Sequence, residues 1–253
     1  MSHTPQYPPG RGLLEGKTVL VTAAAGTGIG FATAKRCLEE GARVAISDIH
    51  ARRLAEAASE LGTHAVLANV ASQADVDRCF ADVIGTFGHV DVLVNNAGLG
   101  GTARLAEMTD EQWTSVLDVT LNGTMRMTRA ALRHMGERGT GSIVNNASVV
   151  GWRAQAGQSH YAAAKAGVMA LTRCAALEAA EAGVRINAVA PSLAMHEHLS
   201  KVTTEELLAD LTTKEAFGRA AEPWEVANVI VFLASDLSSY MTGEIVSVSS
   251  QHP

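Results

Sequence analysis

The chain contains no long hydrophobic run and only three cysteines among its 253 residues. No apolar segment approaches the roughly 18–20 residues that are needed to span a bilayer, so we expect no membrane contact. The cysteines Cys37, Cys79 and Cys174 are widely spaced and lack the spacing of metal ligands. We therefore expect buried free thiols in a reducing compartment, no metal site and a cytoplasmic protein.

The chain also lacks an excess of positive charge. Its 20 Lys and Arg residues face 26 Asp and Glu residues, and the formal net charge of −6 argues against nucleic acid and anionic membranes as partners. A hydrophobic content of 47% is enough for a substantial core in one domain. Residues 1–16 contain no apolar signal-peptide core, so we expect a flexible tail before a single domain over residues 17–253.

Short β-branched runs alternate with longer helical patterns along the chain. The nearly continuous apolar character of the runs is typical of a parallel sheet that is covered on both faces. Strands are predicted at Thr18–Thr22, Arg43–Ser47, His64–Leu67, Val90–Val94, Ser142–Asn146, Arg185–Val189 and Glu244–Val248. Helices are predicted, notably, at Ile29–Glu40, Asp75–Phe87, Asp110–Met135, Tyr161–Ala182 and Trp224–Ala234. This alternation predicts a Rossmann-like, doubly wound α/β fold with a seven-stranded parallel sheet and right-handed crossovers.

The longest connection runs from about Pro191 to Pro223 and contains a further helical pattern at Thr204–Thr213. Connections of this length are usually functional. We therefore expect a substrate lid over about residues 192–222.

Three residues suggest catalysis. Tyr161 and Lys165 are four positions apart in a predicted helix, so they lie on the same face. An ammonium beside a phenol favours the phenolate, and we expect Lys165 to lower the pKa of Tyr161 toward neutral pH. Ser148 ends an apolar strand and can hydrogen-bond a carbonyl or alkoxide oxygen. The alternative is a surface serine with an ordinary Tyr–Lys pair.

A glycine-rich turn follows the first strand and precedes a helix. Glycines at such a turn let the backbone approach a pyrophosphate, which then lies on the helix N-terminus. Asp48 ends the second strand, where a carboxylate accepts hydrogen bonds from ribose hydroxyls and repels a 2′-phosphate. This favours NAD, with NADP not excluded because Arg52 and Arg53 are close in sequence. The alternative for Asp48 is a helix N-cap.

Taken together, Ser148, the Tyr161–Lys165 pair, the glycine turn and the sequence Asn95-Asn96-Ala97-Gly98 resemble the short-chain dehydrogenase/reductase family. The likeness covers nearly the whole chain. It departs at Ala23, where the family has Gly, and the loop to Gly28 is one residue longer.

The resemblance implies a role for each matching position. Ser148 would orient the substrate oxygen, Tyr161 would transfer the proton, and Lys165 would also bind the nicotinamide ribose. Thr120 stands where most members have an Asn that holds a water molecule of a proton relay. The hydroxyl and main-chain carbonyl of Thr120 could hold the same water. The implied cofactor-binding residues are Gly26, Thr27, Gly28, Ile29, Gly30, Asp48, Ile49, Asn69, Val70, Asn96, Ala97, Gly98, Tyr161, Lys165 and Pro191.

Substrate contacts are expected after Ser148 and in the lid. Apolar residues there favour a small hydrophobic alcohol or ketone, and basic residues could meet a carboxylate or the phosphates of a coenzyme A thioester. The candidate substrate residues are Val150, Arg153, His160 and His196. The chain also resembles actinobacterial members of the family that act in steroid-ring (cholesterol) catabolism.

The leading hypothesis is an NAD-dependent enzyme that interconverts a secondary alcohol and a ketone. The alternatives are an NADPH-dependent 3-oxoacyl reductase and a non-catalytic dinucleotide-binding regulator. Ten alanines lie between Tyr161 and Gly183. Such a face is more readily buried than solvated, and the resemblance implies a homotetramer of dihedral symmetry.

Overall fold

The computed structural model describes residues 4–195 and 205–251. Its centre is a seven-stranded, all-parallel sheet with the strand order β3-β2-β1-β4-β5-β6-β7, which confirms the predicted doubly wound class. The strands are β1 (Thr18–Thr22), β2 (Arg43–Asp48), β3 (His64–Leu67), β4 (Val92–Asn95), β5 (Gly141–Asn146), β6 (Val184–Pro191) and β7 (Ile245–Val248).

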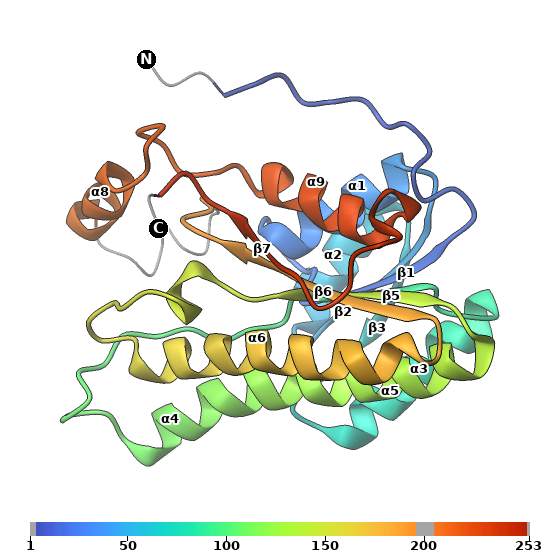
Figure 1. Cartoon of the computed structure of the whole chain (residues 1–253), viewed down its shortest axis with the longest axis horizontal. Helices are drawn as coiled ribbons and strands as arrows, with labels where there is room; N and C mark the ends of the chain where they lie inside the picture. Colours follow the sequence, from blue (N-terminus) through green and yellow to red (C-terminus); the bar gives the residue numbers. More distant parts are fainter. Residues whose placement is uncertain (1–3, 196–204, 252–253) are drawn as a thin grey trace.

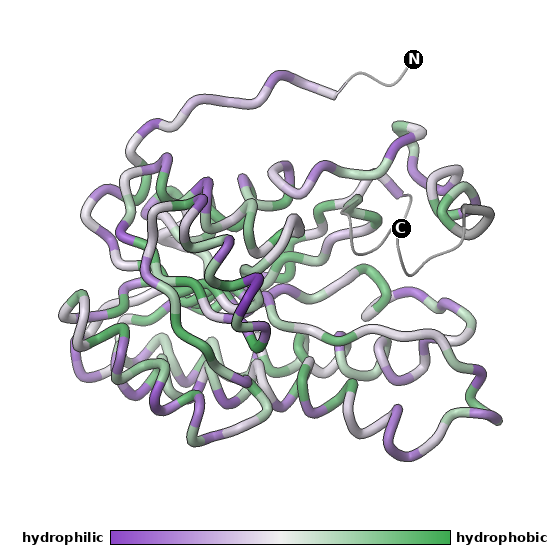
Figure 2. The backbone as a smooth tube through the Cα atoms, turned by 180° about the vertical axis from the view of Figure 1, so that it is seen from behind, coloured by the Kyte–Doolittle hydropathy of each residue, from purple (hydrophilic) through white to green (hydrophobic). Residues whose placement is uncertain are grey.

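Helices cover both faces of the sheet (Figure 1). One face carries α1 (Ile29–Glu39), α2 (Ala51–Leu61) and α9 (Pro223–Ala234), whose apolar side chains form one core cluster with residues such as Val19 and Val21. The other face carries α3 (Gln73–Phe87), α4 (Asp110–Leu117), α5 (Gly123–Arg138) and α6 (Ser159–Ala180). Figure 2 shows that hydrophobic residues are concentrated in the middle of the molecule, between these layers. Helix α2 was not among the predicted helices.

The carboxyl ends of the central strands meet at one edge of the sheet. Asn95 at the end of β4 pairs with Asn145 of β5, and Asn146 pairs with Val189 of β6. In open α/β sheets, ligands bind outside this edge. The register therefore brings the glycine turn, the Asn95-Asn96 pair and Ser148 to the same end of the molecule.

The predicted helix Asp110–Met135 is confirmed, because the chain stays helical from Asp110 to Arg138, but it contains a π-helical turn that was not predicted. Helix α4 starts with a capping box between Thr109 and Gln112, and it ends at Leu117. A π-helical turn, Asp118–Asn122, then precedes α5. Such a turn adds one residue to the helical repeat, which the apolar pattern does not reveal, and π turns are frequent at functional sites.

Two residues of the segment before β1 pack against the domain. The Tyr7 hydroxyl donates to Glu39 of α1 at 2.6 Å, and the Tyr7 ring packs edge-to-face on Trp224 of α9 with 5.3 Å between centroids. Leu14 is fully buried. Tyr7 and Leu14 therefore contact the domain, and the boundary at residue 17 stays a prediction.

The connection after β6 contains α8 (Glu205–Thr213), close to the predicted helical piece. Ala194 and Ala221 form an isolated parallel bridge that joins the two ends of this connection. Figure 1 places α8 at the end of the molecule where α6 begins. Its action as a lid remains a prediction.

Candidate active site

Ser148, Tyr161 and Lys165 come together at the carboxyl edge. Ser148 follows β5 and caps a short 3₁₀ turn, Val149–Gly151, by accepting a hydrogen bond from the Val150 amide at 3.3 Å. Tyr161 and Lys165 lie one turn apart near the start of α6, with Lys165 Nζ 5.5 Å from the centroid of the Tyr161 ring. Ser148 also lies close enough to the Tyr161 phenol to lower its pKa.

Burial dominates the electrostatics of this pair. It raises the pKa of Tyr161 to about 12, against a smaller lowering by Ser148. Burial also lowers the pKa of Lys165 to about 8. The expected lowering of the Tyr161 pKa by Lys165 is therefore wrong, because burial raises this pKa instead. The desolvation of the phenolate outweighs the nearby ammonium, which donates instead to the main-chain carbonyl of Asn146 at 2.5 Å.

Thr120 is fully buried within the π-helical turn. Its hydroxyl accepts from the Leu99 amide at 3.0 Å and donates to the Leu99 carbonyl at 3.2 Å. Its own carbonyl accepts from the Thr124 hydroxyl at 2.8 Å. Because the hydroxyl is paired in both directions with Leu99, the geometry favours fixing the loop after β4 over holding a relay water.

The turn between β1 and α1 has a shape that suits a phosphate group. Ala23 adopts φ +50° and Gly26 φ +127°, both in the region that favours glycine. A Cβ at Gly30 would lie 2.4 Å from the Ala23 carbonyl, so only glycine allows this close approach. No side chain caps the N-terminus of α1 at Gly28, and such an end with its dipole attracts anions. The predicted residues Gly26 to Gly30 therefore fit a dinucleotide pyrophosphate.

Asp48 lies at the end of β2 with 8% of its surface exposed. Its carboxylate accepts from the Ala25 amide at 3.1 Å and from the His50 amide at 3.0 Å. Burial raises its pKa, although the Ala25 amide, the charge of Arg53 and the Ile49 amide act in the other direction. His50, with no side-chain cap, is the N-cap of α2. The alternative interpretation of Asp48 as a helix cap is therefore wrong.

Charged and apolar neighbours of Asp48 are open to solvent. Ile49 is exposed, and Arg52 pairs with Glu56 at 2.7 Å on the surface.

The two predicted cofactor residues after β3 are held by the protein itself. Val70 is buried, and the Asn69 side chain accepts from the Ala71 amide at 3.0 Å.

A threonine that the sequence reasoning missed organises the segment after β4. The Thr22 hydroxyl accepts from the amides of Asn96 and Ala97, each at 3.0 Å. A Cβ on Gly98 would lie 3.4 Å from Lys165 Nζ, so this segment runs directly past the lysine. The structure therefore brings together Asn96, Ala97, Gly98 and Lys165. In the sequence, only the position of Thr22 at the end of the first strand points to its role.

The candidate substrate residues lie in different surroundings. Val150 is in the turn beside Ser148. Arg153 is not free, because its guanidinium hydrogen-bonds to the side chain and carbonyl of Gln251 near the C-terminus. His160 is only 2% exposed, and a Cβ on Gly101 would lie 3.4 Å from its Nε2. His160 therefore packs under the loop after β4 and is not exposed at the surface of the site.

Two further predicted residues complete the set. Pro191 ends β6 and is buried, and His196 lies outside the described residues. The exposed apolar side chains near the site include Leu99 and Trp152, which follow Gly98 and Gly151 in the chain. Trp152 is 51% exposed.

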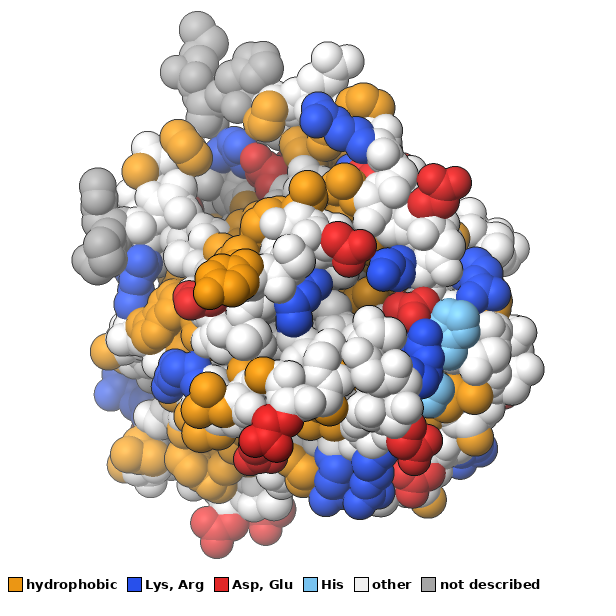
Figure 3. Space-filling view, turned by 45° about the vertical axis from the view of Figure 1, so that its right-hand side comes forward, with side chains coloured by type: hydrophobic (Ala, Val, Ile, Leu, Met, Phe, Trp, Pro, Cys, Tyr) orange, Lys and Arg blue, Asp and Glu red, His pale blue; other side chains and the backbone are white. Residues whose placement is uncertain are grey.

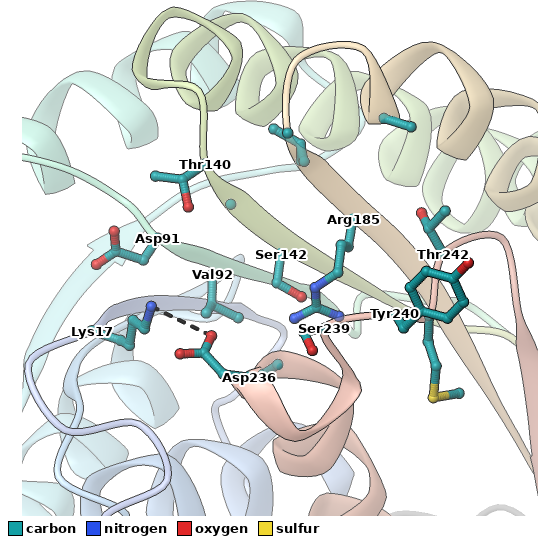
Figure 4. Close-up of a pocket in the computed structure, with 16 residues that line it drawn as sticks. Lys17, Asp91, Val92, Thr140, Ser142, Arg185, Asp236, Ser239, Tyr240 and Thr242 are labelled. Carbon is teal, nitrogen blue, oxygen red and sulfur yellow. Dashed lines mark ion pairs between the residues drawn. The ribbon is translucent and has the colours of Figure 1, made fainter.

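A cavity of about 530 Å³ lies at the opposite, amino edge of the sheet (Figure 4). Its charged lining groups are already paired within the protein. Arg185 donates to the Leu233 carbonyl at 3.0 Å and to Ser238 at 2.8 Å, and Lys17 lies 3.8 Å from Asp236. This cavity is remote from Ser148 and Tyr161 in the fold, so it is not part of the candidate active site.

Basic and acidic side chains are interspersed on the face seen in Figure 3. Within residues 4–195 and 205–251, no helix is long and apolar enough to cross a bilayer, and no three His, Cys, Asp or Glu side chains form a cluster that could hold a metal ion. Cys37 and Cys79 are buried, as expected, whereas Cys174 is exposed.

The fold and the site define a Rossmann-type oxidoreductase. A family model described as enoyl-(acyl carrier protein) reductase matches residues 23–250. The chain is 60% identical to the (5R,7aS)-5-hydroxy-7a-methyl-1-oxo-2,3,5,6,7,7a-hexahydro-1H-indene-carboxyl-CoA reductase of Mycobacterium tuberculosis, over 100% of this chain and 99% of that protein. It is 39% identical to a 3-oxoacyl-(acyl-carrier-protein) reductase of Thermotoga maritima, over 93% of this chain and 97% of that one.

The crystal structure of a short-chain dehydrogenase from Mycobacterium smegmatis superposes with a TM-score of 0.89 at 57% identity, over 100% of this chain and 99% of that one. The chain therefore belongs to the short-chain dehydrogenase/reductase family. It is an oxidoreductase that acts on a carbonyl or alcohol, and members of this family depend on NAD or NADP.

Proposed function

We propose that the protein uses NAD to interconvert a secondary alcohol and a ketone on a hydrophobic ring compound that is carried as a coenzyme A thioester. The observation that carries the proposal is the joining of Ser148, Tyr161 and Lys165 at the carboxyl edge, with Lys165 beside Gly98 of the segment after β4. The name of the Mycobacterium tuberculosis relative supports a ring compound that is linked to coenzyme A. The sequence resemblance suggests that such a compound would come from the breakdown of steroid rings.

The chemistry follows from the geometry of the three side chains. A bound nicotinamide would accept or supply the hydride. Tyr161 takes the hydroxyl proton during oxidation of the alcohol and returns it during reduction of the ketone. The Ser148 hydroxyl holds the substrate oxygen near the phenol, and Lys165 supplies positive charge next to the reacting proton.

Asp48 supports NAD over NADP. Its carboxylate is nearly buried and held by two backbone amides, so it cannot swing away from a bound ribose. A 2′-phosphate there would face negative charge at close range. Arg52 is paired with Glu56, whereas the charge of Arg53 acts on Asp48 itself. An NADPH-dependent 3-oxoacyl reductase is therefore the less favoured candidate.

We also propose a cytoplasmic homotetramer. Helix α6 exposes Leu177 with 76% of its surface open, and α4 carries the partly exposed Trp113. Helices α4 and α6 pack against each other, and an isologous interface would use the same outer face of this helix pair on each subunit. Light scattering at micromolar concentration checks this proposal, and a monomer mass would contradict it.

The enzymatic proposal is tested with a fused-ring secondary alcohol supplied as the free acid and as its coenzyme A thioester, each with NAD⁺ and NADP⁺. Formation of reduced cofactor is followed by absorbance. We expect turnover with NAD⁺ and a higher kcat/KM for the thioester than for the acid. Equal or higher kcat/KM with NADP⁺ would contradict the cofactor assignment. Absence of any turnover or dinucleotide binding would contradict the enzymatic proposal.

A further inference from the structure

Two neighbouring strands each end in a pair of asparagines, and the sheet register places the pairs side by side. Asn95 of β4 pairs with Asn145 of β5, so these two side chains lie on the same face. They join a buried network on the face that α5 and α6 cover, where Asn95 donates to Thr128 and Asn145 donates to Thr172. The next residues, Asn96 and Asn146, turn to the opposite face.

On that opposite face, the orientation of each amide is fixed by its neighbour. The Asn96 amide nitrogen donates to the Ala23 carbonyl at 3.0 Å, in the glycine turn. A carbonyl only accepts, so Asn96 must direct its oxygen the other way. That oxygen accepts from the Asn146 amide nitrogen at 2.9 Å. The Asn146 oxygen therefore cannot exchange places with its nitrogen.

This ordered chain leaves one strong acceptor without a donor. The side-chain oxygen of Asn146 is fully buried and has no hydrogen-bond partner within the described residues. Buried polar atoms of this kind are rare, because an unpaired acceptor loses its hydration without compensation. The main-chain carbonyl of the same residue holds Lys165 Nζ at 2.5 Å. The unpaired oxygen therefore belongs to a residue that contacts both the lysine and, through Asn96, the cofactor turn.

We propose that Asn146 is a cofactor-binding residue, whose side-chain oxygen accepts a hydrogen bond from the nicotinamide-riboside half of the bound dinucleotide. This inference rests on the proposed function. Hydride transfer requires the nicotinamide to lie beside Tyr161, and Lys165 is one turn from Tyr161. The adjoining riboside half carries hydroxyl and carboxamide donors that match a lone acceptor. The turn at Ala23 and Gly30 accounts for the pyrophosphate.

The decisive experiment compares two ligands that differ in this half. Calorimetric titration measures the Kd of NAD⁺ and of ADP, which lacks the nicotinamide riboside, for the wild type and for Asn146→Leu. We expect the substitution to weaken NAD⁺ by about three- to ten-fold, the worth of one net hydrogen bond. The affinity for ADP should change by less than about two-fold.

Two results would overturn the proposal. Equal weakening of NAD⁺ and ADP would mean that Asn146 acts only by supporting Asn96 and the glycine turn. Unchanged affinity for both ligands would mean that the oxygen meets no donor. If Asn146→Leu fails to fold, as judged by thermal unfolding, Asn146→Ala gives the same comparison.

A matched control is Asn228 on α9, whose side-chain oxygen is also buried and unpaired. Asn228→Leu should leave both Kd values unchanged, and a loss of NAD⁺ affinity equal to that of Asn146→Leu would contradict the assignment. The wild type separates this inference from the proposed function. A wild type that binds no dinucleotide would reject the proposed function, whereas normal wild-type binding with no effect at Asn146 would reject only this inference.

Discussion

Lys165 Nζ lies 5.5 Å from the centroid of the Tyr161 ring, yet its hydrogen bond goes to the main-chain carbonyl of Asn146. The strand therefore fixes the ammonium beside the phenol without pairing the two groups. With its pKa raised to about 12, Tyr161 keeps its proton at neutral pH. This is the form that donates a proton in ketone reduction.

Tyr161→Phe should lower kcat by about 10²- to 10⁴-fold, because the variant has no proton to donate or accept. The Kd for NAD⁺ should stay close to the wild-type value. Ser148→Ala should be comparably damaging through loss of the hydrogen bond to the substrate oxygen. Steady-state kinetics with calorimetric binding check both variants, and turnover of Tyr161→Phe within a few-fold of wild type would refute its role.

Lys165 makes a prediction about stability and pH. Its pKa is lowered from 10.5 to about 8, so between these values the unfolded chain binds more protons than the folded one. The Lys165 contribution to the free energy of unfolding therefore rises with pH across that window. Lys165→Met should be more stable than wild type below pH 8, and the difference should shrink as the pH approaches 10.5. Urea unfolding of both proteins across this range checks the sign, and a constant difference would contradict the lowered pKa.

Thr120→Val should reduce stability by about 1–3 kcal/mol, because the Leu99 amide and carbonyl both lose their partner. Thr120→Ser keeps the hydroxyl and serves as the control, with a small loss from the missing methyl group. We also expect Thr120→Val to lower kcat by roughly ten-fold through the displaced loop. Wild-type stability and turnover of Thr120→Val would show that its two hydrogen bonds do not matter.

Gln251 connects two segments that border the active site. It binds Arg153 after Ser148, and its amide donates to Glu215 at 2.9 Å beyond α8. We expect Gln251→Ala to raise KM for the thioester by about three- to ten-fold while kcat changes little, because Arg153 loses its support. Arg78→Ala, which removes an exposed arginine on α3, provides the control. A fall in kcat at constant KM would instead indicate that Gln251 affects the reacting groups.

The fold was predictable because parallel strands have a local signature. Buried strands such as Val92–Asn95 are short, continuous apolar runs, and the helices between them are long. The sequence also predicted the Ser148, Tyr161 and Lys165 site, because these three side chains lie close together in the chain and at fixed spacing. Their joining in the structure needs only one strand end and one helix start.

What could not be predicted depends on contacts between distant segments. The pairing of Thr120 with Leu99 and of Gln251 with Arg153 has no local pattern. The pKa of Tyr161 was misjudged because spacing gives the distance to Lys165 but not the burial of the phenol. The free oxygen of Asn146 is visible only when the orientation of Asn96 is known.

The two environments of Trp152 and Trp224 make the protein its own optical probe. Trp152, half exposed just beyond Ser148, is positioned to change its emission when a ligand covers it. Trp224 packs against Tyr7, which belongs to the segment before β1. The emission of Trp224 should therefore change when this N-terminal segment leaves the domain. Because Trp113 on α4 also emits, replacing each of the three tryptophans by Phe in turn would assign the signals. Binding at the active site could then be followed separately from release of the N-terminal segment.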